Sequence, residues 1–322
     1  MLIDVHAHQF PQKYIETVTR HGRQLMAPMT GGAIEERLAL MDGSGVDMQV
    51  LSPANLVPNF ENEAVAVEAA KILNDGYAEL THRLPKRFKA YVSLPMPHVD
   101  ASLREMERGL DQLGFAGVYS GCSILDRPVT EKEFEPVYNE MNRRGSILCF
   151  HPVVNGLCSA FLNDFNLAGS VGTTLEDTLV VLHMIIRQIP HRYPKIKIII
   201  PHFGGSIPTL LDRIDNQVAA TYTDLPEKPS VTAKRFWYDT VGHGSYPALR
   251  CACEAFGPDH LVTGSDYPVP LMYEGYGKTL QDRHTKAFSY IKEAGLPSDA
   301  VEQILHRSAP DLFGVPRGPS IV

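Results

Sequence analysis

The chain is poor in cysteine and has no pattern that would use its cysteines structurally. It contains five in 322 residues, an odd number without a C-x-x-C pair, so neither a disulfide framework nor a zinc ribbon is predicted. It also lacks a basic segment followed by an apolar one near its start, and it has no run of about 18 apolar residues. We therefore expect a cytoplasmic protein with reduced thiols and no membrane association.

Positive charge is scarce as well. The formal net charge is −7, and no cluster of Lys and Arg is interleaved with aromatic residues, so nucleic-acid binding is not expected. No G-x-G-x-x-G follows the first strand-like segment, which removes the main support for a dinucleotide site. What the chain does have is 44% hydrophobic and 21% charged residues, a composition typical of a globular protein with a large core.

Short β-branched runs alternate with longer amphipathic segments along the whole chain, which is the pattern of repeated βα units. Eight strands are predicted, at Leu2–His8, Asp47–Pro53, Phe88–Pro95, Phe115–Gly121, Ile147–Pro152, Ile196–Phe203, Phe236–Gly242 and Leu261–Pro268. Eight strands that alternate with helices favour a closed (β/α)8 TIM barrel over an open doubly wound sheet. No linker or shift in composition interrupts the pattern, so we expect a single α/β domain over residues 1–322.

The segments between these strands have helical periodicity. Helices are predicted at Glu61–Arg83, Ala101–Leu113, Glu131–Arg144, Leu175–Arg192, Tyr246–Phe256, Leu280–Ala294 and Ser298–Phe313. Two long loops, Arg23–Gly32 and Val153–Gly172, are expected to shape the pocket, because long loops that follow barrel strands are often functional.

The most informative motif is His6-Ala7-His8 at the end of the first strand. Side chains i and i+2 of a strand point to the same face about 7 Å apart, so the two imidazoles can converge on one metal ion. His151, His202 and Asp266 lie at the ends of three other predicted strands, and in a barrel these strand ends share one rim. Each has an ordinary explanation alone, such as a structural His or a helix cap, but together they predict a metal site at the C-terminal face. Imidazoles with one carboxylate suit Zn²⁺ first and Mn²⁺ or Fe²⁺ second.

Several motifs, in this order, resemble the amidohydrolase superfamily. They are DVHAHQFP, CFHP, IIIPHFGGSIPTLLDRIDN, WYDTVGH and HLVTGSDYPVP, and they extend from about Ile3 to Gly314. Within the superfamily they are similar to the branch of aminocarboxymuconate semialdehyde decarboxylase and related aromatic-acid decarboxylases, such as the methylsalicylate and resorcylate enzymes. The resemblance implies a metal-dependent TIM barrel, which agrees with the count of predicted strands.

The resemblance also implies roles for particular residues. The metal ligands would be His6, His8, His151 and Asp266. His202 would be the catalytic acid/base, and Asp266 could share in moving the proton. The predicted fourth strand offers no Lys or Glu to bridge two ions, so one divalent metal is expected, with Zn²⁺ first and Mn²⁺ as the alternative.

Substrate-binding roles are implied for two arginines and a histidine. Arg37 matches the family position that binds a substrate carboxylate, although it could form a surface ion pair instead. Arg213 matches one that reaches the neighbouring subunit's site in a homodimer or higher homo-oligomer, although its position favours the alternative that it holds its own helix. A guanidinium suits bidentate carboxylate recognition. His243, just past the seventh predicted strand, resembles a position that faces the pocket.

Two reaction classes fit this site. In the first, a hydroxy-aromatic or dienoic carboxylic acid loses CO₂ without a redox cofactor, and Asp266 or His202 supplies a proton. In the second, a lactone, an amide or a β-dicarbonyl C–C bond is hydrolysed. A protein that only binds metal and ligand is a third class. The resemblance and Arg37 favour the decarboxylase.

The segment Val153–Leu167 departs from the resemblance, because it lacks the tryptophans of the semialdehyde decarboxylase. The substrate of that enzyme is therefore not carried over to this chain. Residues expected to line a ring-sized, partly apolar cavity are Phe10, Pro53, Asn55, Phe161, Phe165, Tyr267 and Met272.

Overall fold

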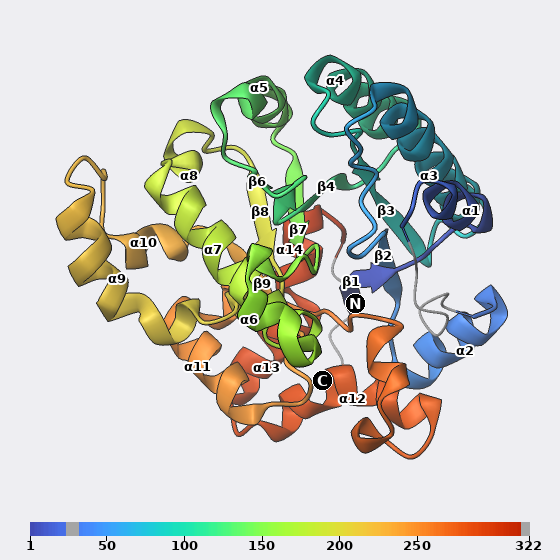
Figure 1. Ribbon diagram of the computed structural model, residues 1–322. Coiled ribbons are helices and arrows are strands. Elements are labelled where there is room, and N and C mark those ends of the chain that lie inside the picture. The colour runs from blue at the N-terminus through green and yellow to red at the C-terminus, as the bar shows by residue number, and fades with distance from the viewer. Residues whose placement is uncertain (24–31, 317–322) are drawn as a thin grey trace.

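The computed structural model describes residues 1–23 and 32–316. Eight parallel strands form one sheet in the order β1-β2-β3-β4-β7-β8-β9-β10, surrounded by helices in Figure 1. The strands are β1 Ile3–His8, β2 Met48–Ser52, β3 Phe88–Ser93, β4 Gly117–Gly121, β7 Ile147–His151, β8 Lys197–Ile200, β9 Trp237–Asp239 and β10 Leu261–Val262. The predicted (β/α)8 barrel is confirmed.

Strand β1 closes the barrel against the segment that follows β10. The amide of Val5 donates to the Thr263 carbonyl at 2.9 Å, and the amide of His8 donates to the Tyr267 carbonyl at 2.7 Å. A parallel bridge between Ala7 and Tyr267 lies beside them. The first and last strands thus meet along a seam of few backbone hydrogen bonds.

The last two strands are shorter than predicted. Strand β10 ends at Val262 and not at Pro268, because the next residues pair with β1 only at isolated positions. The amide of Ser265 donates to the Asp4 carboxylate at 2.9 Å, and Asp266 has a left-handed φ of 58°. The chain therefore turns sharply and presents Asp266 at the rim.

Fourteen α-helices are present in the described residues. Their bounds are α1 Gln12–Arg20, α2 Ile34–Ser44, α3 Glu63–Arg83, α4 Val99–Glu107, α5 Glu135–Arg144, α6 Ala160–Asn163, α7 Gly172–Ile186, α8 Ile189–Arg192, α9 Ile207–Thr221, α10 Pro229–Ala233, α11 Tyr246–Phe256, α12 Leu280–Glu293, α13 Ser298–His306 and α14 Ser308–Phe313. A small hairpin pairs β5 Ser123–Ile124 with β6 Arg127–Pro128. No described helix is long and apolar enough to cross a bilayer, and all five cysteines are free.

Two predicted helices are each broken in two. The segment Leu175–Arg192 divides into α7 and α8 because Gln188 takes a left-handed φ of 56°. The segment Ser298–Phe313 divides into α13 and α14 at Arg307, whose φ is −121°. The predicted loop Val153–Gly172 contains α6 and shorter helical turns, whereas residues 24–31 of the other predicted loop lie outside the described residues.

The barrel interior is filled from the bottom, which leaves only the C-terminal rim open. Val5, Val50 and Tyr91 pack inside the barrel in one cluster with Ala309 and Leu312 of α14. Helix α14 also contacts β1 and β10 and lies behind the strands in Figure 1. The polar residues at the strand ends therefore face a cavity on the opposite side.

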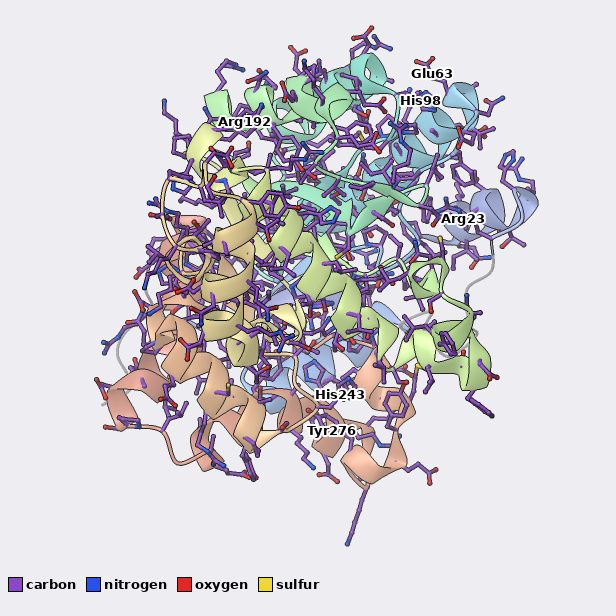
Figure 2. The ribbon with its side chains drawn as sticks, turned by 60° about the vertical axis from the view of Figure 1, so that its left-hand side comes forward. Arg23, Glu63, His98, Arg192, His243 and Tyr276 are labelled. Atoms are coloured by element: carbon purple, nitrogen blue, oxygen red, sulfur yellow. The ribbon has the colours of Figure 1, made fainter. Side chains whose placement is uncertain are left out.

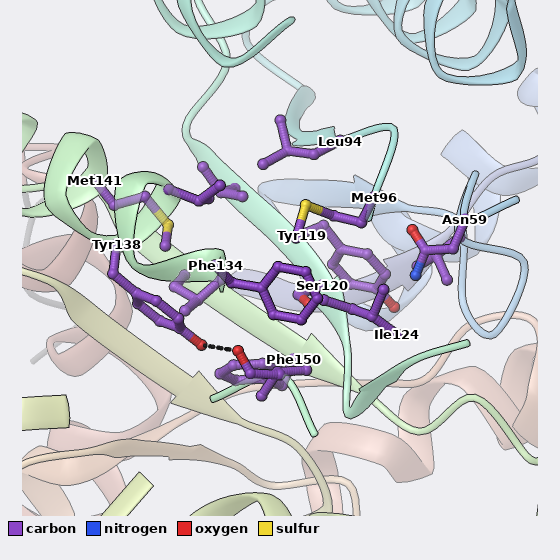
Figure 3. Close-up of a pocket in the computed structure, with 15 residues that line it drawn as sticks. Asn59, Leu94, Met96, Tyr119, Ser120, Ile124, Phe134, Tyr138, Met141 and Phe150 are labelled. Carbon is purple, nitrogen blue, oxygen red and sulfur yellow. Dashed lines mark hydrogen bonds between the residues drawn. The ribbon is translucent and has the colours of Figure 1, made fainter. Parts of the chain in front are cut away.

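A second, smaller void lies in the barrel wall under α5. It measures about 30 Å³, and Figure 3 shows Leu94, Met96 and Phe150 among the side chains around it. The Tyr138 hydroxyl donates to the Val129 carbonyl at 3.1 Å, so its polar end is satisfied. Because its lining is mostly apolar and it has room for about one water, we interpret it as a packing gap in the core.

Candidate metal centre

Four side chains from opposite ends of the chain meet at the C-terminal rim. His6 and His8 come from β1, His151 ends β7, and Asp266 follows β10; their possible ligand atoms all lie within 4.8 Å of one another. Nε2 of His8 is 2.8 Å from Asp266 Oδ1 and 3.2 Å from Nε2 of His6. All four are buried. The structure thus brings together the four residues that the motifs indicate as ligands.

The other ring nitrogen of each imidazole has its own partner. Nδ1 of His6 lies 2.6 Å from Asp239 Oδ2, and Nδ1 of His151 donates to the Pro152 carbonyl at 2.7 Å. Nδ1 of His8 is 3.0 Å from the Ser52 hydroxyl. These contacts turn all three Nε2 atoms toward the centre, which is how outer partners orient metal-binding histidines.

The charges at this centre also fit a cation. His6 lies between the carboxylates of Asp239 and Asp266; burial lowers its pKa, but the two carboxylates outweigh burial and raise it well above its ordinary value. Burial instead holds the pKa of His151 well below its ordinary value and lowers that of His8 to about 4. A proton on His6 thus occupies the place of a positive charge that a metal ion would supply, with release of that proton on binding.

His202 stands beside this cluster. It begins the turn His202–Gly204 after β8, and its ring centre is 5.4 Å from that of His6. Its backbone amide donates to Asp239 Oδ1 at 2.9 Å, and its Nδ1 lies 2.8 Å from Asp177 Oδ2. Its φ of 50° is left-handed, a conformation that costs energy and persists where surrounding contacts hold it.

The sequence reasoning assigned no role to Asp177 or Asp239. Asp239 ends β9 in the quoted WYDTVGH motif, so its place at the same rim was a usable signal for a supporting carboxylate. Asp177 lies in α7 and is completely buried, but nothing in its local sequence distinguishes it from a surface helix residue. Burial raises the pKa of its carboxyl to about 6, although His202 opposes that rise.

A cavity of about 660 Å³ opens above the cluster. His8, His151, His202 and Asp266 belong to its lining. The other lining residues include Asn55, Val154, Ser170, Thr173, Thr174, Phe203, Thr209, Val241, His243, Cys251, Val269, Met272 and Tyr273. Among the described residues, no Lys or Arg lines it. The cavity is thus large enough for an aromatic ring, and it is polar at the floor and mixed at the walls.

Arg37 lies beneath this floor. It is 0% exposed and donates to the Gln49 amide oxygen at 2.7 Å and to the His8 carbonyl at 2.8 Å. Its guanidinium also stacks 4.4 Å from the centre of the Tyr267 ring. The alternative of a surface ion pair is therefore wrong, and the guanidinium does not reach the cavity that the predicted carboxylate contact requires.

The other two predicted substrate-binding residues lie nearer the solvent. His243 lines the mouth of the cavity, and Figure 2 shows it next to Tyr276, whose ring centre is 6.1 Å away. Arg213 is exposed on α9 and is not among the residues that line the cavity of its own chain.

The expected cavity residues divide into three groups. Asn55 and Met272 line the cavity, whereas Phe10, Pro53 and Tyr267 are buried beside it. Phe161 and Phe165 do not line it and are each 86% exposed. The expectation fails for these two because their segment folds into short helical turns that direct both rings to solvent.

The sequence of this chain is similar to those of several named enzymes. The chain is 28% identical over 241 residues to 2-amino-3-carboxymuconate-6-semialdehyde decarboxylase of Dictyostelium discoideum, covering 73% of this chain and 66% of that enzyme. It is 28% identical over 257 residues to gamma-resorcylate decarboxylase of Rhizobium radiobacter, covering 73% of this chain and 76% of that one. This chain therefore spans about two thirds of the length of the Dictyostelium relative.

The fold and the family are both shown by these comparisons. The crystal structure of dihydroxybenzoic acid decarboxylase from Polaromonas sp., with bound manganese and 2-nitroresorcinol, matches with a TM-score of 0.81 over 98% of both chains at 20% identity. At that identity the likeness concerns the fold. The sequence profile of the amidohydrolase family matches residues 3–315. Because that match covers nearly the whole chain and includes every residue of the candidate centre, this protein belongs to the amidohydrolase family.

Proposed function

We propose that this protein is a metal-dependent, non-oxidative decarboxylase of a hydroxy-aromatic or dienoic carboxylic acid. The observation that carries the proposal is the four-residue centre of His6, His8, His151 and Asp266 at the floor of a ring-sized cavity. His202 lines the same cavity. The decarboxylases named above, related to this chain at 28% identity, support the reaction class.

A single divalent ion is proposed at this centre. When bound, it would supply a positive charge and Lewis acidity at the cavity floor. Three imidazole nitrogens and one carboxylate oxygen favour Zn²⁺. Mn²⁺ is the alternative that the Polaromonas decarboxylase supports.

The chain's own residues would bind the acid and move one proton. Decarboxylation breaks the bond between the ring and its carboxylate, leaves the electron pair on the ring carbon, and needs a proton there. Burial raises the pKa of Asp266, but hydrogen bonds to His6 and His8 outweigh burial and hold it well below its usual range. Asp266 therefore holds its own proton poorly. We assign the transferred proton to Nε2 of His202 in its doubly protonated form, with His243 as a substrate contact at the mouth.

A homodimer or higher homo-oligomer is proposed to complete the site. The cavity has no Lys or Arg among the described residues, whereas Arg213 is exposed on α9 close in sequence to Pro208 and Thr209, which do line it. An arginine supplied by a second copy would give the cavity the cation that one chain does not provide, and would bind a substrate carboxylate.

The test is CO₂ release from a panel of ortho-hydroxybenzoates and carboxymuconate-type acids, together with the metal content of the purified protein. We expect about one equivalent of Zn or Mn and CO₂ release that the Asp266→Ala variant loses. Arg20→Ala, on an exposed face of α1, is the control, and it should retain both the bound metal and CO₂ release.

Two results would contradict the proposal. Bound metal without CO₂ from any acid, but with hydrolysis of a lactone or amide, would reassign the protein to the hydrolase class. If Asp266→Ala lost the metal but still released CO₂, the metal centre would have no part in the reaction.

A further inference from the structure

The side chain of Asp177 has an unusual position for a carboxylate. It is 0% exposed and extends from α7 to Cys122, just after β4, and to His202, after β8. One oxygen, Oδ2, lies 2.8 Å from Nδ1 of His202. The other, Oδ1, is 3.6 Å from the Cys122 thiol. Within the described residues, these are the hydrogen-bond partners of its side chain.

This arrangement determines which nitrogen of His202 carries the proton. An ionised carboxylate only accepts hydrogen bonds, so Nδ1 must be the donor and hold a hydrogen. Nε2, on the other edge of the ring, is then the nitrogen available to the cavity that His202 lines. The contact with Cys122 is consistent with this assignment, because the thiol donates and the Asp177 carboxylate is again the acceptor.

The remaining contacts of His202 do not orient its ring. Asp239 accepts only the backbone amide of His202, which fixes the main chain and leaves rotation about the side-chain bonds free. The rings of His6 and His151 lie 5.4 Å and 5.9 Å away, centre to centre, and donate no hydrogen bond to it among the described contacts. Asp177 therefore holds the ring.

We propose that Asp177 is the positioning residue of the active site: it fixes His202 with a hydrogen on Nδ1 and presents Nε2 to the substrate. The proposal rests on the decarboxylase function only for its effect on rate, since the orientation of His202 exists without substrate. Asp177 does not line the cavity, and its described hydrogen bonds go to Cys122 and His202 and to none of the four candidate ligands.

The variant Asp177→Asn is informative because Cys122 determines how the new amide would orient. The thiol donates to the amide oxygen, which places the amide NH₂ against Nδ1 of His202. That group donates where the carboxylate accepted, so His202 must move its hydrogen to Nε2. The shape of the site is kept, but Nε2, the nitrogen that faces the cavity, then carries a hydrogen instead of a lone pair.

The first measurement is solid-state ¹⁵N NMR of the full zinc-loaded chain labelled at histidine, with His202→Ala used to identify the His202 signals. At a pH at which His202 is neutral, we expect Nδ1–H in the wild-type protein and Nε2–H in Asp177→Asn. Cys122→Ala is the control, because it removes the other partner of Asp177 and leaves the contact with His202; its spectrum should match that of the wild type.

The second measurement is steady-state kinetics with an acid that the wild type decarboxylates. Asp177→Asn should lower kcat by about 100-fold or more, the size of a general acid–base contribution, with little change in KM or metal content. An unchanged ¹⁵N pattern with kcat within about threefold of wild type would overturn the proposal. If no acid is decarboxylated by the wild type, the proposed function fails, and the ¹⁵N result still decides the role of Asp177.

Discussion

Arg37 donates a hydrogen bond from Nη1 to the backbone carbonyl of His8, 2.8 Å away, and so supports a candidate metal ligand from below. Replacing it with Met would leave the buried acceptors of His8 and Gln49, and the half-buried acceptor of Gln9, unpaired. We expect Arg37→Met to lower the free energy of unfolding by about 3 kcal/mol, measured by urea denaturation. Arg20→Met, at an exposed position on α1, should change it by less than about 0.5 kcal/mol. If Arg37→Met were as stable as the wild type and only its KM were raised, the result would instead favour a role for Arg37 in substrate binding.

Asp239 should control metal affinity without being a ligand. Its carboxylate accepts from Nδ1 of His6 at 2.6 Å, and an amide in its place would lose the charge that makes His6 a better ligand. We expect Asp239→Asn to weaken metal binding by about 10- to 100-fold, measured by competition with a chromophoric chelator. Asp259→Asn, at an exposed carboxylate, is the control; equal affinities in the two variants would exclude this role for Asp239.

Glu176 should make stability depend on pH. It accepts a 2.6 Å hydrogen bond from the Val153 amide, and burial raises its pKa from 4.5 to about 7. The folded state therefore binds more protons than the unfolded state between about pH 4.5 and 7, so its contribution to unfolding free energy falls as pH rises through that window.

The matched variant for this prediction is Glu176→Gln, which cannot ionise. The stability of wild type minus that of the variant should fall by up to about 1.4 kcal/mol per pH unit between pH 5 and 7 and then level off. Urea denaturation of both proteins at several pH values measures this difference, and a flat difference would contradict the raised pKa.

Arg213 offers a test of active-site sharing. If it acts in the partner's cavity, a mixture of Arg213→Ala and Asp266→Ala chains, each inactive alone, forms dimers with one complete site. After unfolding and refolding together, random reassortment should restore about a quarter of the wild-type rate. No recovery in a mixture that contains mixed dimers, as separated by a tag on one chain, would confine Arg213 to its own subunit.

The barrel and the metal ligands could be predicted because local patterns encode them. The run Ile196–Phe203 predicts a buried parallel strand from its β-branched residues alone, and the spacing of His6 and His8 places both on one face. The C-terminal ends of parallel strands meet at one rim, so residues distant in sequence could be grouped without a structure.

The supporting residues could not be predicted, because their roles depend on three-dimensional contacts. Asp177 reaches His202 from a helix 25 residues earlier in the chain. Arg37 has acidic neighbours in sequence, as a surface residue would, yet it is completely buried under His8. Phe161 and Phe165 are aromatic, as residues that line a ring-sized cavity often are, but the turns of their segment expose both side chains to solvent.

The candidate metal centre spans the seam at which the barrel closes. His8 and Asp266 are 258 residues apart in sequence, and they lie on the two strand segments joined there by few backbone hydrogen bonds. An ion held by both would act as a cross-link that closes a loop of 258 residues, and such long loops cost the most entropy to close. The centre can form only after Asp266 has been synthesised and the seam has closed, so metal uptake would mark the closure of the barrel as well as the gain of activity.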